Sequence, residues 1–210
     1  MTRILCWAIA VAVMAWMGSP AEAVLSINEI MADPASDWDG DGEYNYKDDE
    51  WVEICNDGAD PLDLGRFGLS DDAGLWTFGF ETGDLLNPGE TRVIFGSESV
   101  AWQDAHGHSL YGFSMSNDGD TVVLWEFAGS DTLLVDSHTF NTYEADDDRS
   151  TGRNPDGIGD WEIFDALNPY NGSNPPLGNG LPPSPGWPNT GDPPVKLGGA
   201  TWGNVKALFR

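Results

Sequence analysis

Short hydrophobic runs separated by turn residues place the strongest constraint on how this chain can fold. The runs are rich in β-branched and aromatic residues, and between residues 24 and 140 no stretch has sustained helical periodicity. They cover residues 25–31, 51–55, 62–64, 68–70, 75–80, 91–95, 121–127 and 132–140. Clusters such as Asn56-Asp57-Gly58 lie between the runs and are typical of turns. The pattern predicts an all-β domain, and the spacing of the strands favours a sandwich.

Alternation of side chains along a strand indicates which residues share a face. In the run 51–55, Val52 and Ile54 share one face, and Trp51 and Cys55 share the other. We expect the tryptophans in or near strand motifs to be core residues, namely Trp51, Trp76, Trp125 and Trp161. Trp38 and Trp102 are the better candidates for exposure, where an indole can stack on the apolar CH face of a sugar.

The first 23 residues have the features of a secretory signal peptide. Arg3 precedes an uncharged apolar run from Ile4 to Met17, and the small-residue sequence Ala21-Glu22-Ala23 follows. The run is shorter than the about 18 to 20 residues of a membrane-spanning helix. We therefore expect residues 1–23 to be removed, leaving a secreted chain without a membrane span, extracellular or at the cell surface. Only Cys55 then remains, so no internal disulfide is possible.

The charge of the chain narrows the choice of partners. The formal net charge is −26, from 35 acidic and 9 basic residues. So acidic a surface repels nucleic acids and anionic membranes, and it attracts divalent cations. A secreted domain without a disulfide depends on its core or on bound ions for stability. The lack of a disulfide therefore favours the hypothesis that the chain binds a stabilising cation.

An acidic loop that runs directly into the strand at 51–55 has the spacing of a calcium-binding loop. Alternating carboxylates are followed by Gly42, which supplies the left-handed residue at the tight turn, and the position after it contributes a backbone carbonyl. The predicted ligands are Asp37, Asp39, Asp41, Glu43, Asn45 and Asp48. A hard cation with six to eight oxygen ligands, Ca²⁺, is the cofactor that this set predicts.

An alternative interpretation is an acidic turn that binds no ion, since Asp and Gly are common turn residues. Asp48 replaces the bidentate Glu of an EF-hand, and in this respect the loop resembles that of dockerin modules. A strand follows the loop, however, and a second loop is absent. The loop is therefore expected to brace the entry to a strand and not to dock on a cohesin.

Several motifs, taken in order, resemble a bacterial lamin-tail domain over residues 24–171. They are LSINEIMADP, DEWVEICNDGADPLDLGRFGLSDD, LNPGETRVIFG, SNDGDTVVLWEFAGSDTLLVDSHTF and RSTGRNPDG, followed by Trp161. The resemblance implies an immunoglobulin-like β-sandwich, here residues 24–172, with a non-catalytic role in binding or extracellular architecture. In that family an acidic insertion between the first strand and the next is common, which fits the calcium-like loop.

The composition changes after the sandwich. Residues 173–199 contain 8 of the 14 prolines together with Gly and Asn, so they are predicted to form a semi-extended linker. Residues 200–210 form a short basic tail. Trp202, Val205 and Phe209 would make one apolar stripe if this tail were helical, so the tail is a candidate for docking or anchoring.

Candidate catalytic groups are few. Glu29 and Glu53 lie inside two strand runs, and a carboxylate pair is what glycoside hydrolysis uses, but buried carboxylates are more often bonded to backbone donors or to an arginine such as Arg153. Cys55 is expected to be a small buried hydrophobe. Solvated loop or strand-edge positions account for all three histidines, which are His106, His108 and His138. No catalytic residue is therefore predicted.

The sequence predicts a secreted, non-catalytic binding or structural module that calcium stabilises. Its partner is expected to be an extracellular protein or a polysaccharide. The alternative is a secreted calcium-dependent hydrolase that acts on polysaccharide or another extracellular polymer. An enzyme of this kind requires a cleft where two or more titratable groups converge, so the two hypotheses differ in a feature that a structure can test.

The tail generates the first testable prediction. If it is a localisation signal, deleting residues 200–210 releases the protein from the cell surface into the medium and leaves the melting temperature of the sandwich unchanged. Cell fractionation and thermal melting of the deletion variant measure the two effects. A truncated protein that stays where the full-length protein does would contradict the prediction.

Overall fold

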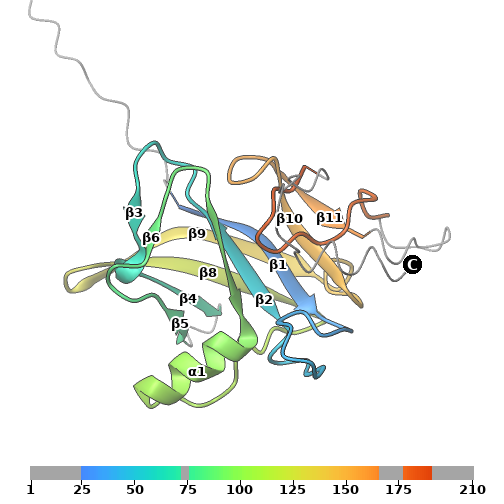
Figure 1. Ribbon diagram of the computed structural model, residues 1–210, viewed down its shortest axis with the longest axis horizontal. Coiled ribbons are helices and arrows are strands. Elements are labelled where there is room, and N and C mark those ends of the chain that lie inside the picture. The colour runs from blue at the N-terminus through green and yellow to red at the C-terminus, as the bar shows by residue number, and fades with distance from the viewer. Residues whose placement is uncertain (1–24, 72–75, 166–176, 191–210) are drawn as a thin grey trace, which may run out of the picture.

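Two β-sheets form the body of the molecule, which a computed structural model describes over residues 25–71, 76–165 and 177–190 (Figure 1). The five strands of the larger sheet are, in spatial order, β11 (Asp160–Phe164), β10 (Arg149–Asn154), β1 (Ser26–Asp33), β2 (Trp51–Cys55) and β7 (Thr91–Phe95). The four of the second sheet are β5 (Trp76–Gly79), β4 (Phe67–Asp71), β8 (Gly119–Ala128) and β9 (Asp131–Asn141). The remaining elements are β3 (Leu62–Asp63), which pairs with β6 (Leu85–Leu86), the 3-10 helix η1 (Leu64–Arg66) and the helix α1 (Gly96–His106). The predicted all-β, immunoglobulin-like sandwich is confirmed.

The hydrophobic runs of the sequence correspond to eight strands of the structure. Their ends differ from the predicted ones by at most two residues. The sequence did not predict β6, β10, β11 or α1. Strand β10 has the sequence RSTGRN, which contains no apolar run, although its first four residues are buried. Its burial follows from its place beside β1 in the sheet, which local periodicity does not encode.

Helix α1 was not predicted from the sequence, because it packs through polar and small residues and has no apolar stripe. Its buried positions are Gly96, Ser99 and Gln103. The Ser99 hydroxyl and the Gln103 amide both donate to the carbonyl of Thr77, at 2.6 and 3.1 Å. Helices are recognised in sequence by an apolar stripe, and this helix is attached by hydrogen bonds instead.

The core lies between the two sheets and follows the predicted alternation. Val52 and Ile54 of β2 face it and are fully buried. Leu69 and Leu124 face it from the second sheet. Trp51 lies on the opposite face of β2 and is also fully buried. The larger sheet is therefore covered on both of its faces, although only one of them meets the other sheet.

A bulge in β5 sends two aromatic residues to opposite faces of the second sheet. Phe78 pairs with Leu69 and joins the core, whereas Trp76 pairs with Ser70 because the register shifts between these pairs. Trp76 contacts Trp125 on the face that points away from the core. The prediction that Trp76 and Trp125 are core residues is therefore wrong.

The other tryptophans are divided differently from the prediction. Trp161 packs against the core and Trp51 is buried, as predicted. Trp102 and Trp38 were expected to be exposed, but both are half-buried. Trp102 packs against the core beside Phe78. Trp38 lies against Trp51, with ring centroids 6.2 Å apart.

A buried ion pair fixes β10 to the residue that follows β11. Arg149 and Asp165 have side chains that are 1 and 2 % exposed, and their N–O distance is 2.6 Å. The Arg149 guanidinium also donates to the carbonyl of Tyr143 at 2.6 Å. Burial of two charges costs solvation energy, which only close pairing and further hydrogen bonds offset.

This pair generates a stability prediction. Arg149→Met removes the guanidinium that faces the buried Asp165 carboxylate, so the free energy of unfolding should fall by about 3 to 5 kcal/mol. Arg66→Met is a control in an exposed pair with Glu126 and should cost less than about 1 kcal/mol. Urea titration at pH 7 measures both. If both variants lower the free energy of unfolding by the same amount, the buried pair of Arg149 and Asp165 is no more important for stability than the exposed one.

Candidate functional site

The acidic loop between β1 and β2 winds tightly around the carboxylate of Asp37. One oxygen of Asp37 accepts the N–H of Gly40 at 2.7 Å, and the other accepts the N–H of Gly42 at 3.1 Å. Both glycines have left-handed backbone angles, with φ of 81° and 98°. The left-handed turn predicted at Gly42 is confirmed. Asp39 accepts the N–H of Asp41 at 3.0 Å, which continues the winding.

Asp49, which the sequence analysis did not select, joins two of the predicted ligands. Asp37, Asp39 and Asp49 each offer a carboxylate oxygen, and these oxygens lie within 4.8 Å of one another. Asp49 is fully buried and accepts the N–H groups of Trp38 and Asp39. Its second oxygen accepts the N–H of Asn45 at 2.8 Å. In the sequence, only its place next to Asp48 marks Asp49 as a candidate ligand, and the spacing of the calcium-loop pattern favours Asp48.

The other predicted ligands lie around this group. Asp41, Glu43 and Asn45 are exposed along the loop. The Asn45 side chain donates to Asp48 at 2.8 Å. Burial raises the pKa of Asp48, and the nearby carboxylates of Asp39, Asp41 and Asp49 raise it further. The loop therefore gathers negative charge that its own hydrogen bonds do not neutralise.

These residues fit a calcium ion by their chemistry. All of the side-chain donors are carboxylate or amide oxygens, which hard cations prefer. Burial is the main cause of the raised pKa of Asp48, and the carboxylates of Asp39, Asp41 and Asp49 add to it. A cation among these groups would reduce the repulsion between them. Asp37, Asp39 and Asp49 are the side chains that would hold the ion, since their carboxylate oxygens converge, and Asp48 adds a further carboxylate beside them.

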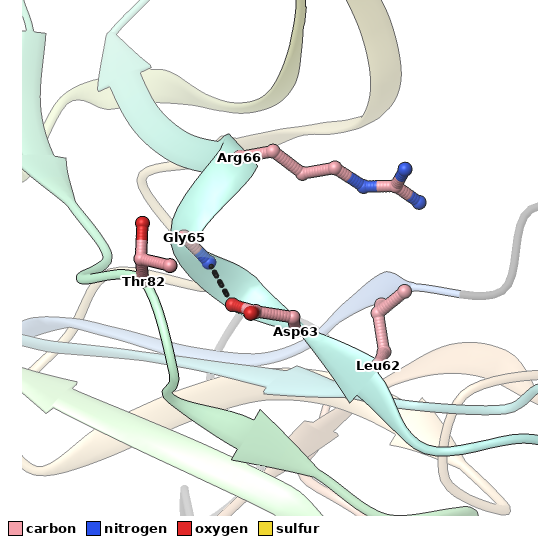
Figure 2. A pocket seen from close by; sticks show the side chains of 5 residues that line it. All are labelled: Leu62, Asp63, Gly65, Arg66 and Thr82. Atoms are coloured by element: carbon pink, nitrogen blue, oxygen red, sulfur yellow. Dashed lines mark hydrogen bonds between the residues drawn. The ribbon is translucent and has the colours of Figure 1, made fainter.

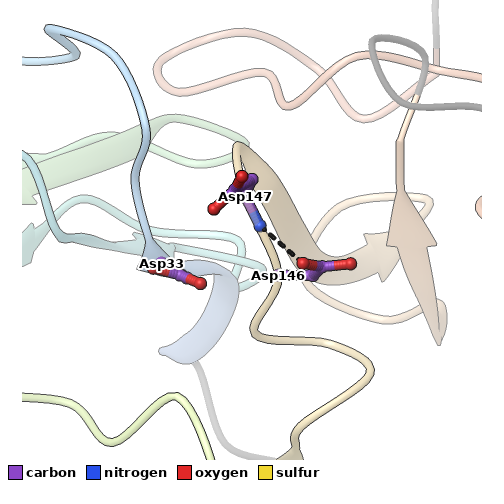
Figure 3. A group of neighbouring side chains, drawn as sticks. All are labelled: Asp33, Asp146 and Asp147. Atoms are coloured by element: carbon purple, nitrogen blue, oxygen red, sulfur yellow. Dashed lines mark hydrogen bonds between the residues drawn. The ribbon is translucent and has the colours of Figure 1, made fainter.

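A second acidic cluster lies beside the loop and consists of Asp33, Asp146 and Asp147 (Figure 3). The pairing of β1 with β10 brings them together, since Asp33 lies opposite Arg149. Burial raises the pKa of Asp33, and the carboxylate of Asp147 raises it further. Residues far apart in the sequence form this cluster, so no local spacing could have revealed it.

Asp148 connects this cluster to the calcium-like loop. Its carboxylate accepts the N–H of Ala35 at 2.9 Å, the hydroxyl of Ser36 at 2.8 Å and the indole N–H of Trp38 at 2.6 Å. The start of the loop is therefore fixed to the turn before β10. These bonds link the loop to the edge where β1 meets β10.

Two further carboxylates, Glu29 and Glu53, lie on the outward face of the larger sheet. They are register partners on β1 and β2 and are fully buried. Burial raises the pKa of Glu29 to about 8, and the neighbouring Glu53 contributes to the rise. Burial also raises the pKa of Glu53, to about 7. The structure therefore does bring this pair of sequence candidates together, in a covered position.

Residues 177–190 cover these carboxylates. Glu29 accepts the N–H and the hydroxyl of Ser184, both at 3.1 Å, and Glu53 accepts the N–H of Gly186 at 2.6 Å. Asn189, also buried, donates to the carbonyl of Arg153 at 3.0 Å. We call residues 177–190 the strap. Figure 1 shows it, in orange-red, in front of β10 and β1.

The strap lies within the range predicted to be a semi-extended linker. It has no regular secondary structure, but its side chains and backbone are bonded to the sheet. The sequence signal of Pro and Gly content cannot distinguish such a docked segment from a free one. The predicted boundary at residue 172, the signal peptide at 1–23 and the tail at 200–210 lie outside the described residues.

The comparisons with known proteins identify the family. The profile of the lamin tail domain matches residues 18–142. This chain belongs to the lamin tail domain family. Lamin tail domains have a non-enzymatic immunoglobulin-like fold, in agreement with the sandwich described above. No curated protein and no solved structure matches the chain significantly.

The matched range of this lamin tail domain ends just after β9. Strands β10 and β11 and the strap lie beyond it, yet β10 pairs with β1, and the strap bonds to Glu29. The folded unit therefore extends past the matched range and includes the segment that covers the larger sheet.

The histidines of this lamin tail domain lie in two separate places. His106 and His108 both stack on Trp102, with ring centroids 4.5 and 5.1 Å away. His138 on β9 stacks on Trp161 and lies 3.3 Å from Glu144. The three side chains do not form one cluster.

Cys55 is buried and free, and burial raises its pKa to about 12. Such a thiol stays protonated at neutral pH and is a weak nucleophile. The expectation of a small buried hydrophobe is confirmed.

A hollow beside η1 has a volume of about 380 Å³ (Figure 2). It is lined by Leu62, Asp63, Gly65, Arg66 and Thr82. Asp63 accepts the N–H groups of Gly65 and Gly83, both at 3.0 Å, and these bonds lower its pKa. Asp63 is the only acidic residue in the described lining of this hollow, so two carboxyl groups do not converge there.

Among the residues that the structure describes, no helix is long and apolar enough to cross a membrane. Helix α1 has 11 residues and lies at the edge of the second sheet, beside β5.

The covered carboxylates generate a pH prediction. Glu29 keeps its proton up to about pH 8 in the folded state, whereas in the unfolded chain it loses the proton near its ordinary value of 4.5. The folded state therefore holds more protons between these values, and the free energy of unfolding falls as the pH rises from about 5 to 8. The side chain of Glu29→Gln stays neutral at every pH, so the free energy of unfolding of this variant should fall less than that of the natural chain. The difference can reach about 1.4 kcal/mol for each unit by which the folded and unfolded pKa values of Glu29 differ.

Urea titrations at several pH values in the presence of a chelator measure this decline. Glu43→Gln on the exposed loop is the matched control and should retain the dependence of the natural chain. If Glu29→Gln declines as steeply as the natural chain, the buried Glu29 does not contribute to the pH dependence.

Proposed function

We propose that this lamin tail domain is a secreted, non-catalytic binding or structural module of the bacterial cell surface or extracellular space, and that calcium stabilises it. The observation that carries the proposal is the convergence of Asp37, Asp39 and Asp49 in a loop wound by two left-handed glycines. Asp48 adds a carboxylate whose pKa is raised by burial and, further, by the neighbouring carboxylates of Asp39, Asp41 and Asp49. A divalent cation is the ligand that this geometry accommodates best.

The position of the loop explains how an ion would act. The loop ends at β2, which lies beside β1 in the larger sheet, and it is tied to the turn before β10 through Asp148. An ion held by the loop would therefore stabilise two connections of β1, one on each side. Its effect is expected on stability and not on catalysis, since the carboxylates are used as ligands.

The sequence supports the location and the class of partner. The N-terminal segment has the features of a signal peptide, and the net charge of −26 disfavours nucleic acids as partners. An extracellular protein or a polysaccharide is the proposed partner. The basic tail at residues 200–210 is the proposed anchoring segment.

Calcium should raise the melting temperature of the natural chain. An ion that binds only the folded state stabilises it by about 2.7 kcal/mol at a hundredfold excess over the dissociation constant, which for extracellular modules is about 0.1 to 1 mM. Asp39→Ala should abolish the shift and leave the melting temperature in chelator nearly unchanged, because it also removes repulsion. Scanning calorimetry in chelator and in millimolar calcium measures both.

Asp60→Ala is the matched control for this experiment. It removes one exposed carboxylate at the opposite end of β2 and should keep the full calcium shift. Magnesium should give a smaller shift, since it demands a more regular octahedral site. Identical melting curves of the natural chain in chelator and in calcium would refute the calcium site.

A further inference from the structure

The outward face of the second sheet carries a group of apolar side chains. Trp76 of β5 contacts Trp125 and Phe127 of β8, with ring centroids 6.5 and 5.0 Å away. Leu134 of β9 is the register partner of Trp125. Phe127 is 40 % exposed and Leu134 is 59 % exposed. We call these four residues the aromatic face.

The backbone and neighbouring side chains hold the rings in place. The indole N–H of Trp125 donates to the hydroxyl of Ser70 at 2.7 Å. Gly68, opposite Trp125, leaves room for Phe127, since a Cβ at Gly68 would lie 3.3 Å from the phenyl ring. The rings are therefore held in place by the sheet and by their neighbours, as a preformed binding surface requires.

Hydroxyl groups continue this face along β8 and β9. Thr121 and Thr139 are register partners, and their hydroxyl oxygens lie 2.9 Å apart. Ser137 lies opposite Val123 and is exposed. The outward positions of the described strands β4, β5, β8 and β9 are those on the same side of the sheet as Trp125. The side chains at these positions are all uncharged.

Charge decides which partner suits such a face. The chain has a net charge of −26, so an anionic polymer is repelled, and a second copy would bring two such charges together. A basic protein would be attracted to the acidic clusters and not to the aromatic face. A neutral partner is neither repelled by the net charge nor drawn to the acidic clusters. Apolar patches of this kind on soluble proteins mark binding sites.

We propose that the aromatic face, with the hydroxyl groups beside it, binds a neutral polysaccharide. Pyranose rings have flat CH faces that stack on aromatic side chains, and their hydroxyl groups match Thr121, Ser137 and Thr139. This inference rests on the proposed binding role and names the partner class for it. Trp38 and Trp102 were the tryptophans predicted to be available for sugar stacking, but Trp76 and Trp125 are the ones that lie on this outward face.

Binding to defined polysaccharides tests the proposal with the full mature chain in calcium. Microcrystalline cellulose and crystalline chitin serve as insoluble probes, hydroxyethylcellulose serves in affinity gels, and polygalacturonate is the anionic contrast. The natural chain should bind at least one of the neutral probes and should not bind polygalacturonate.

Leu133 and Leu134 provide a matched pair of variants. They are neighbours on β9 with similar exposure, 50 and 59 %, but Leu134 pairs with Trp125 and Leu133 pairs with Glu126, so they point to opposite faces. Leu134→Lys should weaken binding about tenfold, and Leu133→Lys should leave it within about twofold. Trp76→Ala should also weaken it, and thermal melting shows that each variant is folded.

Three results would overturn the proposal. They are a natural chain that binds none of the neutral probes, a Leu134→Lys variant that binds like the natural chain, and a dimer in sedimentation that Leu134→Lys disperses. A chain that binds no polysaccharide but keeps its calcium shift and its surface location leaves the proposed function in place. Loss of the calcium shift with normal polysaccharide binding would affect the calcium proposal alone.

Discussion

Burial of the larger sheet on both faces is the constraint on which the rest of the structure depends. One face meets the second sheet through apolar side chains such as Val52 and Ile54. The other carries Glu29 and Glu53, and a buried carboxylate requires hydrogen-bond donors or a proton. The strap supplies a backbone N–H and a hydroxyl to Glu29 and a backbone N–H to Glu53. A segment without secondary structure therefore belongs to the fold, because it satisfies polar groups that the sheet buries.

The carboxylates of this acidic chain have distinct roles according to their surroundings. Asp49 and Asp148 accept backbone or indole N–H groups and hold the loop before β2 in place. Asp37 winds that loop, and Asp48 accepts the side-chain amide of Asn45. A large net charge is thus compatible with a compact domain, since many of its acidic groups replace backbone partners that turns lack.

The sequence predicted those parts of the fold that local patterns encode. Strands with alternating or continuous apolar residues were found, as was the left-handed turn at Gly42. Strand β10 and helix α1 were missed because polar residues bury them, through pairing with β1 and through the bonds of Ser99 and Gln103 to Thr77. Asp49 was missed because spacing alone favoured Asp48, and the exposure of Trp76 depends on a bulge in β5 that no residue type marks.

The pairing of β1 with distant segments has a consequence for how fast the domain folds. Glu29 on the first strand bonds to Ser150, 121 residues away, and to Ser184, 155 residues away. Contacts of such separation require the closure of long chain segments before they contribute stability, and domains rich in them fold slowly. The first strand to be synthesised must wait for the last third of the chain before both of its neighbours are present. The sandwich therefore cannot be completed until most of the chain has left the ribosome.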